Sequence, residues 1–257
     1  MRIRLLPSSF GAGAPEPQYL TSYLINDAVA IDAGSIGFNA GPVQQAQVRH
    51  VFLTHSHIDH VASLPLFLET SFKDRAHECV HVYGNEAVLE SLQQDLFNDR
   101  IWPDFIRISK GPNEFIRLHH IEAGQSVEVE GLVLTAVEVD HVVPTLGFVI
   151  EDRSTCVVIP SDTAPTEEIW EVANQRERVS AVFLECSFPE SMRELADLTK
   201  HLTPDLFREE LTKLRDEVTA VAVHIKAMYA AEIIEELRSR NISCLEFGTQ
   251  KPVFEFE

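Results

Sequence analysis

A dense group of metal-binding side chains stands in the sequence Thr54-His55-Ser56-His57-Ile58-Asp59-His60. Three imidazoles and one carboxylate within six positions are suitable ligands for a borderline-soft divalent metal ion. Neighbouring side chains of one loop point in different directions, so all four cannot easily reach a single ion. These four side chains can more easily bind two ions, each of which takes some of the donors of the loop. The pattern therefore predicts a dinuclear metal site.

Two metal sites need further donors from elsewhere in the chain, and three candidates stand where a predicted strand ends. They are His141, Asp162 and His224, which follow the predicted strands 132–139, 156–159 and 220–223. Functional residues commonly occupy such loops on a rigid scaffold. Taken singly, each of the three is as readily an ordinary core or surface residue. The prediction rests on their joint occurrence.

The rest of the pattern predicts the elements that position these residues. Short strands are expected at 2–6, 19–25 and 28–32, with Asn26-Asp27 as a hairpin turn. Further strands are expected at 48–53, 79–83, several places between 115 and 159, 181–184, 220–223 and 242–247, and helices at 86–98 (capped by Asn85), 204–214 and 230–239. A β-rich first half and an alternating second half predict an α/β fold of two mixed sheets with helices outside, in four αββα layers. No repeat or long linker interrupts the chain, so one domain over 1–257 is expected.

The composition limits the partners. The chain has 40 acidic and 21 basic side chains and a formal net charge of -19, which disfavours a broad nucleic-acid or anionic-membrane surface. No apolar run approaches the roughly 20 residues that span a bilayer, and the first residues lack the apolar region of a secretory signal. Four dispersed cysteines without a C-x-x-C pair suit a reducing compartment. We therefore expect a cytoplasmic protein without a membrane segment.

The order of these motifs resembles the metallo-β-lactamase superfamily, in which an H-x-H-x-D-H loop is followed by a His, an Asp and a late His. The resemblance implies that superfamily's αββα sandwich and two divalent ions. Zinc is the expected ion, although manganese and iron also suit these donors. It implies His55, His57 and His141 at one ion, Asp59, His60 and His224 at the other, and Asp162 bridging the two. Asp32 matches a position that braces the metal loop.

Later motifs resemble the phosphodiesterase branch of this superfamily, which includes ribonuclease Z and the class II cyclic-nucleotide phosphodiesterases. They are Glu185 in Leu184-Glu185-Cys186-Ser187-Phe188-Pro189 and His201 in Lys200-His201-Leu202-Thr203-Pro204. Residues 96–105 and His224-Ile225-Lys226 look specifically like the class II enzymes. The chain departs from the class II signature at Ile58, Pro65, Leu68-Glu69 and Ala227, so the identity of the nucleotide is left open.

The resemblance implies hydrolysis of a small phosphodiester, most closely a 3′,5′-cyclic nucleotide of the cAMP type. His201, oriented by Glu185, is the expected proton donor to the leaving oxygen, and Asp162 is expected to take part in catalysis. His141 and Asp162 stand only 21 positions apart. That spacing leaves no room for the tRNA-clamping arm that ribonuclease Z, where it has one, inserts there, so together with the charge it disfavours long nucleic acids.

Several aromatic residues follow the metal loop, and core packing is the expected role of most of them. Trp102 and Phe72 are the candidates for a pocket that stacks the base. The other histidines match no family position and are expected to be structural or surface residues: His50, His77, His81, His119 and His120. Three alternatives stay open, namely a ribonuclease Z-like nuclease, a lactonase or thioesterase on the same metals, and a non-catalytic metal-binding module. The resemblance is compatible with a homodimer.

Overall fold

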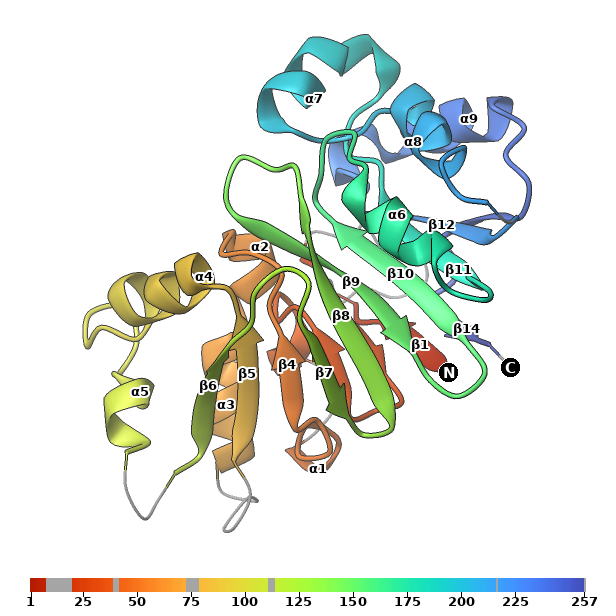
Figure 1. The fold of residues 1–257 in the computed structure, drawn as a ribbon. Helices are drawn as coiled ribbons and strands as arrows, with labels where there is room; N and C mark the ends of the chain where they lie inside the picture. Colours follow the sequence, from red (N-terminus) through yellow and green to blue (C-terminus); the bar gives the residue numbers. More distant parts are fainter. Residues whose placement is uncertain (8–19, 39–41, 73–78, 111–113, 216, 257) are drawn as a thin grey trace. The chain divides into compact units, whose positions relative to one another are not determined.

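The computed structural model describes residues 1–7, 20–38, 42–72, 79–110, 114–215 and 217–256, without the side chains of Pro42, Ser71 and Phe72. The chain divides into two compact units (Figure 1). Among the described residues, the N-terminal unit comprises 2–7 and 20–122, and the C-terminal unit comprises Met1 and 123–256. The prediction of a single domain over 1–257 stays a prediction. In the described part of the chain, we find no helix with the length and apolar character needed to cross a membrane.

The N-terminal unit is built on a mixed sheet whose strands are hydrogen-bonded in chain order. The strands are β1 (Arg2–Leu5), β2 (Tyr23–Ile25), β3 (Val29–Ile31), β4 (His50–Phe52), β5 (Val80–Gly84) and β6 (Ile116–His120). Neighbours from β1 to β3 are antiparallel, and neighbours from β3 to β6 are parallel. Asn26 and Asp27 form the predicted turn between β2 and β3, with positive φ angles of 49° and 59°, as a tight two-residue hairpin requires.

Short helical segments connect these strands. They are η1 (Ile36–Phe38), α1 (Pro42–Gln45), α2 (Ile58–Val61), α3 (Leu64–Phe72), α4 (Glu86–Ser91), the π-helical turn η2 (Leu92–Leu96) and α5 (Phe105–Ile108). Asn85 caps α4 as predicted, because its Oδ1 accepts the N–H of Val88 at 2.9 Å. Such a cap typically stabilises a helix by about 1 kcal/mol. The predicted helical stretch over 86–98 continues past Ser91 as the wider η2 turn and ends at Leu96.

The C-terminal unit contains a second mixed sheet, again with its strands hydrogen-bonded in chain order. They are β7 (Ser126–Val129), β8 (Leu132–Val139), β9 (Thr145–Glu151), β10 (Cys156–Ser161), β11 (Ala181–Glu185), β12 (Thr219–Val223) and β13 (Leu245–Phe247). Neighbours from β7 to β10 are antiparallel and neighbours from β10 to β13 are parallel. The residues of this unit also include β14 (Val253–Glu255), which is not a strand of this sheet.

Three helices of the C-terminal unit bury apolar residues in one core with its sheet: α6 (Glu168–Asn174), α8 (Pro204–Leu211) and α9 (Ala230–Ser239). The unit also contains α7 (Arg193–Thr199) and the 3-10 turns η3 (Glu190–Met192) and η4 (Ala227–Tyr229). The bounds of α9 are the predicted ones, and its Ile233 and Leu237, one turn apart, are fully buried. Trp170 of α6 is also buried. Each such side chain contributes roughly 1.5–3 kcal/mol by its burial.

The parallel strands decide where functional side chains gather. Asp162 directly follows β10, Glu185 ends β11 and His224 directly follows β12. Because these strands are parallel neighbours, their carboxyl ends lie along one edge of the sheet. In the N-terminal unit, Asp32 and Thr54 follow the parallel neighbours β3 and β4 in the same way. The predicted fold class, two mixed β-sheets with helices, is confirmed.

Candidate metal centre

The histidine loop of the N-terminal unit is held by the carboxylate of Asp32. Its Oδ1 accepts the backbone N–H of Thr54 at 2.8 Å, and its Oδ2 accepts from Nδ1 of His60 at 2.7 Å. The hydroxyl of Thr54 donates to the same carboxylate at 2.9 Å. Asp32 is fully buried with a left-handed φ of 62°. Burial raises the pKa of Asp32, while His60 and the hydrogen bonds from Thr54 oppose that rise.

The backbone of this loop is fastened to the turn that follows β3. The carbonyl of Asp59 accepts the N–H of Thr21 at 2.8 Å, and the carbonyl of Thr21 accepts the N–H of Gly34 at 2.9 Å. A Cβ atom on Gly34 would lie 2.0 Å from the carbonyl oxygen of Asp59, closer than any side chain permits. Gly34 is therefore the residue that allows the two segments to approach.

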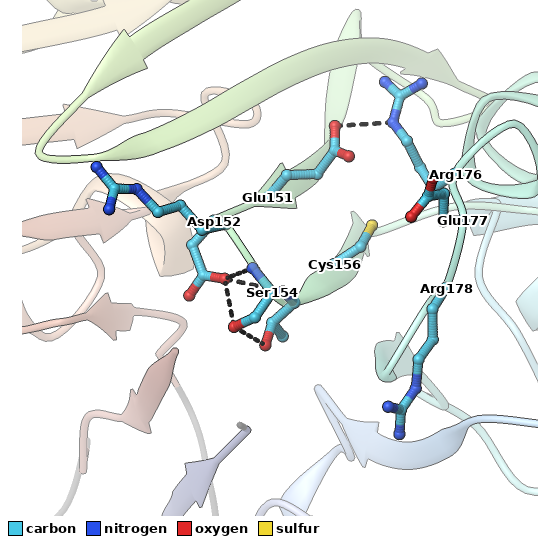
Figure 2. A pocket seen from close by; sticks show the side chains of 9 residues that line it. Glu151, Asp152, Ser154, Cys156, Arg176, Glu177 and Arg178 are labelled. Atoms are coloured by element: carbon cyan, nitrogen blue, oxygen red, sulfur yellow. Dashed lines mark hydrogen bonds and ion pairs between the residues drawn. The ribbon is translucent and has the colours of Figure 1, made fainter.

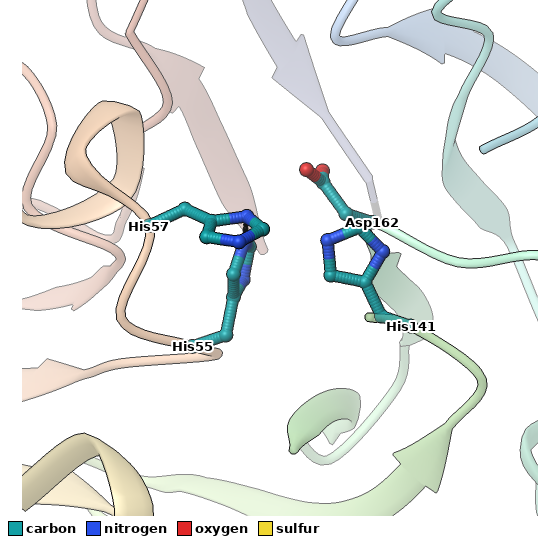
Figure 3. Close-up of side chains that lie close together, drawn as sticks. All are labelled: His55, His57, His141 and Asp162. Carbon is teal, nitrogen blue, oxygen red and sulfur yellow. Dashed lines mark hydrogen bonds between the residues drawn. The ribbon is translucent and has the colours of Figure 1, made fainter. Parts of the chain in front are cut away.

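Hydrogen bonds decide which ring nitrogen of the loop histidines carries a lone pair. Nδ1 of His60 faces a carboxylate, which only accepts, so Nδ1 holds the proton and Nε2 the lone pair. The Thr54 hydroxyl gives its hydrogen to Asp32 and therefore accepts from Nδ1 of His55 at 3.0 Å. The remaining nitrogen of His55, Nε2, lies 3.0 Å from Nδ1 of His57 (Figure 3). Two imidazole nitrogens of this loop thus lie side by side.

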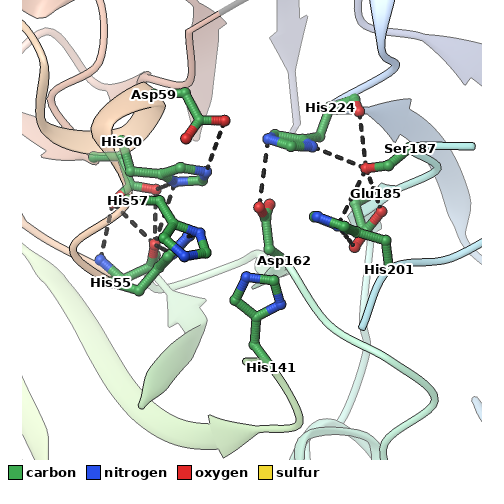
Figure 4. Close-up of polar contacts among 12 residues, drawn as sticks. His55, His57, Asp59, His60, His141, Asp162, Glu185, Ser187, His201 and His224 are labelled. Atoms are coloured by element: carbon green, nitrogen blue, oxygen red, sulfur yellow. Dashed lines mark hydrogen bonds and ion pairs between the residues drawn. The ribbon is translucent and has the colours of Figure 1, made fainter. Parts of the chain in front are cut away.

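The sheet edge of the C-terminal unit brings together Asp162 and His224 as the topology requires. Oδ2 of Asp162 lies 3.4 Å from Nε2 of His224 (Figure 4). Asp162 is only 2% exposed, so its carboxylate is largely withdrawn from water. His224 adopts a left-handed φ of 52°, which turns the chain sharply as β12 ends.

A buried hydrogen-bond network joins Glu185, Ser187, His201 and His224 (Figure 4). Nδ1 of His201 lies 2.7 Å from Oε1 of Glu185, and the Ser187 hydroxyl donates to Oε2 at 2.7 Å. Since Ser187 has given its hydrogen away, its oxygen accepts from Nδ1 of His224 at 2.9 Å. The N–H groups of Thr163 and Leu202 also donate to Glu185, at 3.1 and 3.3 Å. The predicted Glu185–His201 pair is therefore in contact, and Ser187 links it to His224.

The environment of His201 favours its charged form. Burial lowers the pKa of His201, but the neighbouring carboxylates of Glu185 and Asp162 outweigh burial and raise it above the ordinary 6.5. Its Nδ1 proton faces Glu185, so Nε2 is the nitrogen that can exchange a proton with another group.

His141 is oriented by Lys200. Nδ1 of His141 donates to the backbone carbonyl of Lys200 at 3.1 Å, and the Lys200 ammonium lies 2.5 Å from Oδ1 of Asp140. Lys200 ends α7 in a left-handed conformation with φ 55° and ψ 56°, which points its carbonyl toward His141. Because a carbonyl only accepts, Nδ1 of His141 carries the proton and Nε2 the lone pair.

The donors of each unit fit a divalent metal ion. Four of the five expected imidazole ligands direct the Nδ1 proton to a protein oxygen and present Nε2 as the lone pair: His55, His60, His141 and His224. Metal-binding histidines are usually held in this way. Two nitrogen or oxygen ligands of a tetrahedral zinc ion lie roughly 3.3–3.4 Å apart. The observed 3.4 Å between Asp162 and His224, and 3.0 Å between His55 and His57, are close to that separation.

The predicted base pocket is less defined. Trp102 is half-buried, and its ring packs against Phe105 at a centroid distance of 6.4 Å with the planes perpendicular. Phe72 ends α3, and its side chain lies outside the described part of the structure, as does the whole of His77. The pocket assignment of Trp102 and Phe72 stays a prediction.

A separate cavity of about 220 Å3 lies in the C-terminal unit at the β9–β10 turn (Figure 2). Glu151 pairs with Arg176 at 2.8 Å, and Oδ1 of Asp152 accepts the N–H groups of Ser154 and Thr155. Asp152 thus stabilises the turn, and the Glu151–Arg176 ion pair connects β9 to the segment that follows α6. None of the predicted site residues lines this cavity.

Comparison with known proteins agrees with the donor pattern and the two sheets. The family model described as the β-lactamase superfamily domain matches residues 30–238, which is most of the chain. The chain belongs to the metallo-β-lactamase superfamily. Ribonuclease Z of Pyrococcus abyssi is 28% identical over 42% of this chain and 32% of its own length. The 3′,5′-cyclic-nucleotide phosphodiesterase 1 of Saccharomyces cerevisiae is 23% identical over 73% of this chain and 60% of its own length. The chain thus spans between about a third and three fifths of these curated relatives.

Solved structures share the metallo-β-lactamase fold. Unliganded yeast PDE1 has a TM-score of 0.76 at 16% identity, covering 96% of each chain. The metallo-β-lactamase fold protein YhfI from Bacillus subtilis has a TM-score of 0.75 at 16% identity, covering 99% of each chain. The predicted superfamily is confirmed, and the two curated relatives are named as a ribonuclease Z and a cyclic-nucleotide phosphodiesterase.

Two residues that orient the site were not predicted, although both stand in motifs that the sequence made visible. Ser187 lies in the segment that contains Glu185, and Lys200 directly precedes His201. The signal for Ser187 was its two-residue spacing from Glu185, which places both on one face of an extended segment. Nothing in the sequence indicates that the backbone of Lys200 is left-handed.

Proposed function

We propose that this chain is a dinuclear metal-dependent phosphodiesterase whose substrate is a 3′,5′-cyclic nucleotide of the cAMP type. The observation that carries the proposal is the buried Glu185–His201 pair of the C-terminal unit, linked through Ser187 to the expected metal ligand His224. Metal binding alone does not require a histidine such as His201, which is held by a carboxylate beside the ligand His224.

Seven residues are proposed to hold two ions. His55, His57 and His141 would bind one ion, Asp59, His60 and His224 the other, and Asp162 both. Zinc suits this set, and manganese or iron would also bind it. When bound, such ions lower the pKa of water and stabilise negative charge on phosphoryl oxygens.

The protein's own residues would handle the leaving group. Glu185 holds the Nδ1 proton of His201, so the ring presents Nε2 to the departing ribose oxygen. Donation of the Nε2 proton of the charged ring avoids the release of an unstable alkoxide, and such general acids typically accelerate a reaction about 10²–10⁴-fold. Glu185 itself is held by four donors and keeps the ring in one orientation.

A small substrate is supported by the connection between His141 and Asp162. That connection is filled by β9 and β10, joined by a turn at residues 152–155. A long RNA-clamping insertion is therefore absent from this fully described segment. With a net charge of -19, the chain also repels polyanions more strongly than a single phosphodiester.

The test is hydrolysis of a substrate panel by the metal-loaded protein. The panel contains cyclic AMP, bis(p-nitrophenyl) phosphate, a precursor tRNA, a lactone and a glutathione thioester. Cleavage of the two small phosphodiesters with inert lactone and thioester would support the proposal. Turnover of the lactone or thioester alone would refute it.

A ribonuclease Z-like nuclease is the second candidate, because several curated relatives carry that name. Preferential cleavage of the precursor tRNA would establish it instead. A homodimer and a cytoplasmic location are further proposals; all four cysteines are thiols, which supports a reducing compartment.

A further inference from the structure

A second cluster of soft metal-binding atoms lies on the sheet of the N-terminal unit, away from the expected metal loop. Cys79 and His81 stand two positions apart, Cys79 directly before β5 and His81 within it, and so point to the same face. Sγ of Cys79 lies 3.6 Å from Nε2 of His81. Nδ1 of His81 lies 2.8 Å from Nε2 of His119 on the neighbouring strand β6. None of the three belongs to the proposed dinuclear centre.

The sulfur-to-nitrogen distance is the one that a shared metal ion requires. Tetrahedral zinc holds a thiolate at about 2.3 Å and an imidazole nitrogen at about 2.0–2.1 Å, so the two ligand atoms lie roughly 3.5 Å apart. The observed 3.6 Å between Sγ of Cys79 and Nε2 of His81 matches this separation.

His119 is placed so that it can hold His81 in the tautomer that a metal needs. If Nδ1 of His81 donates to Nε2 of His119, Nε2 of His81 presents its lone pair toward the sulfur. An acceptor behind a metal-binding imidazole commonly fixes its tautomer in this way. The His81 and His119 rings are also stacked, with centroids 5.0 Å apart, so the acceptor is itself confined.

The surroundings are compatible with a cation. Cys79, His81 and His119 are all half-buried, so an ion can reach them from solvent. The guanidinium of Arg117, which acts on His81, is paired with Glu114, whose Oε1 accepts from Nε of Arg117 at 3.1 Å. Burial and Arg117 lower the pKa of His81, which keeps the ring neutral near pH 7.

We propose that Cys79 and His81, with His119 as the positioning residue behind His81, form a separate site for one zinc-like transition-metal ion, whose remaining positions are filled by solvent. On binding, the Cys79 thiol releases its proton and the thiolate bonds to the metal. The inference is independent of the proposed function, because it uses neither the dinuclear ligands nor turnover.

Cobalt(II) titration tests the site without an activity assay. The ligands proposed for the dinuclear centre include no sulfur, so a thiolate-to-cobalt charge-transfer absorption would report the second site alone. We expect this absorption in the wild-type protein and its loss in Cys79→Ser. The matched control is Cys244→Ser, which removes an exposed thiol of the C-terminal unit and should leave the absorption unchanged.

The positioning role of His119 gives a second readout. His119→Ala should weaken cobalt binding about 10–100-fold, and His119→Gln, whose amide oxygen can still accept from Nδ1 of His81, should restore most of it. Zinc should slow alkylation of Cys79 but not of Cys244. A wild-type protein without the absorption at saturating cobalt, or an absorption that survives Cys79→Ser, overturns the site. Rapid alkylation of Cys79 that zinc does not slow would assign it as a reactive thiol instead. Circular dichroism confirms that each variant is folded.

Discussion

Replacement of His201 by alanine separates proton donation from metal binding. The change removes the ring that donates to Oε1 of Glu185 at 2.7 Å. Glu185 keeps the Ser187 hydroxyl and two backbone N–H groups, so the fold should survive with a loss of about 1–3 kcal/mol for the missing hydrogen bond. His224 keeps its acceptor, Ser187. The variant should therefore bind two metal ions as the wild type does.

The expected loss of turnover depends on the leaving group. With cyclic AMP, whose leaving ribose oxygen needs a proton, kcat should fall about 10²–10⁴-fold, which corresponds to about 3–5 kcal/mol of transition-state stabilisation. With bis(p-nitrophenyl) phosphate the leaving p-nitrophenolate is a stable anion and needs no proton. The fold decrease in kcat should therefore be at least ten times smaller than with cyclic AMP. The assay compares kcat for both substrates at full metal occupancy, measured by elemental analysis.

Two results would contradict the assignment of His201. Wild-type turnover of cyclic AMP would show that the ring donates no proton. Equal losses on both substrates would instead indicate a structural role. His120→Ala is the matched control, because His120 is an exposed histidine outside every motif and should leave both rates unchanged.

Three further predictions concern stability. Asp32→Asn replaces one carboxylate oxygen by an NH2 group, so at least one of the three donors that face the carboxylate loses its acceptor. The free energy of unfolding in urea should therefore fall by about 1–3 kcal/mol, and an unchanged midpoint would contradict the bracing role. Gly34→Ala places a Cβ 2.0 Å from the Asp59 carbonyl oxygen and should cost about 1–3 kcal/mol or more, with reduced metal occupancy as the second measurement. Burial lowers the pKa values of His81 and His119 below 6.5, so the unfolded chain binds more protons and stability should decrease as the pH falls through 6.5. The double variant with glutamine at both positions should show a smaller slope.

The sequence was most informative where local chemistry decides the structure. Asn26-Asp27 tolerates positive φ and forms the predicted hairpin turn, and the apolar spacing of 230–239 predicts α9 at both ends. The helical stretch predicted over 86–98 changes from α-helical to π-helical at Leu92, where the N–H of Phe97 bonds to the carbonyl of Leu92, five residues back. The periodicity of the side chains does not reveal this change of hydrogen bonding.

The expected ligands could be identified because their residue types and strand-end positions are visible in the chain. Their orienting partners could not, since those depend on which strands become neighbours. Ser187 acquires its role only because β11 and β12 are parallel and bring His224 beside it. The carbonyl of Lys200 acquires its role from a backbone angle that carries no side-chain signature.

The position of Lys200 limits how the neighbouring residues His141 and His201 can evolve or be engineered. Its carbonyl holds His141, its ammonium reaches Asp140, and the next residue is His201, held by Glu185. A single peptide segment therefore sets the direction of an expected ligand and of the expected acid together. A shift of the backbone at Lys200 would therefore change the orientations of His141 and His201 together. Although its side chain is 39% exposed, position 200 should accept chiefly glycine and asparagine, which tolerate its left-handed backbone.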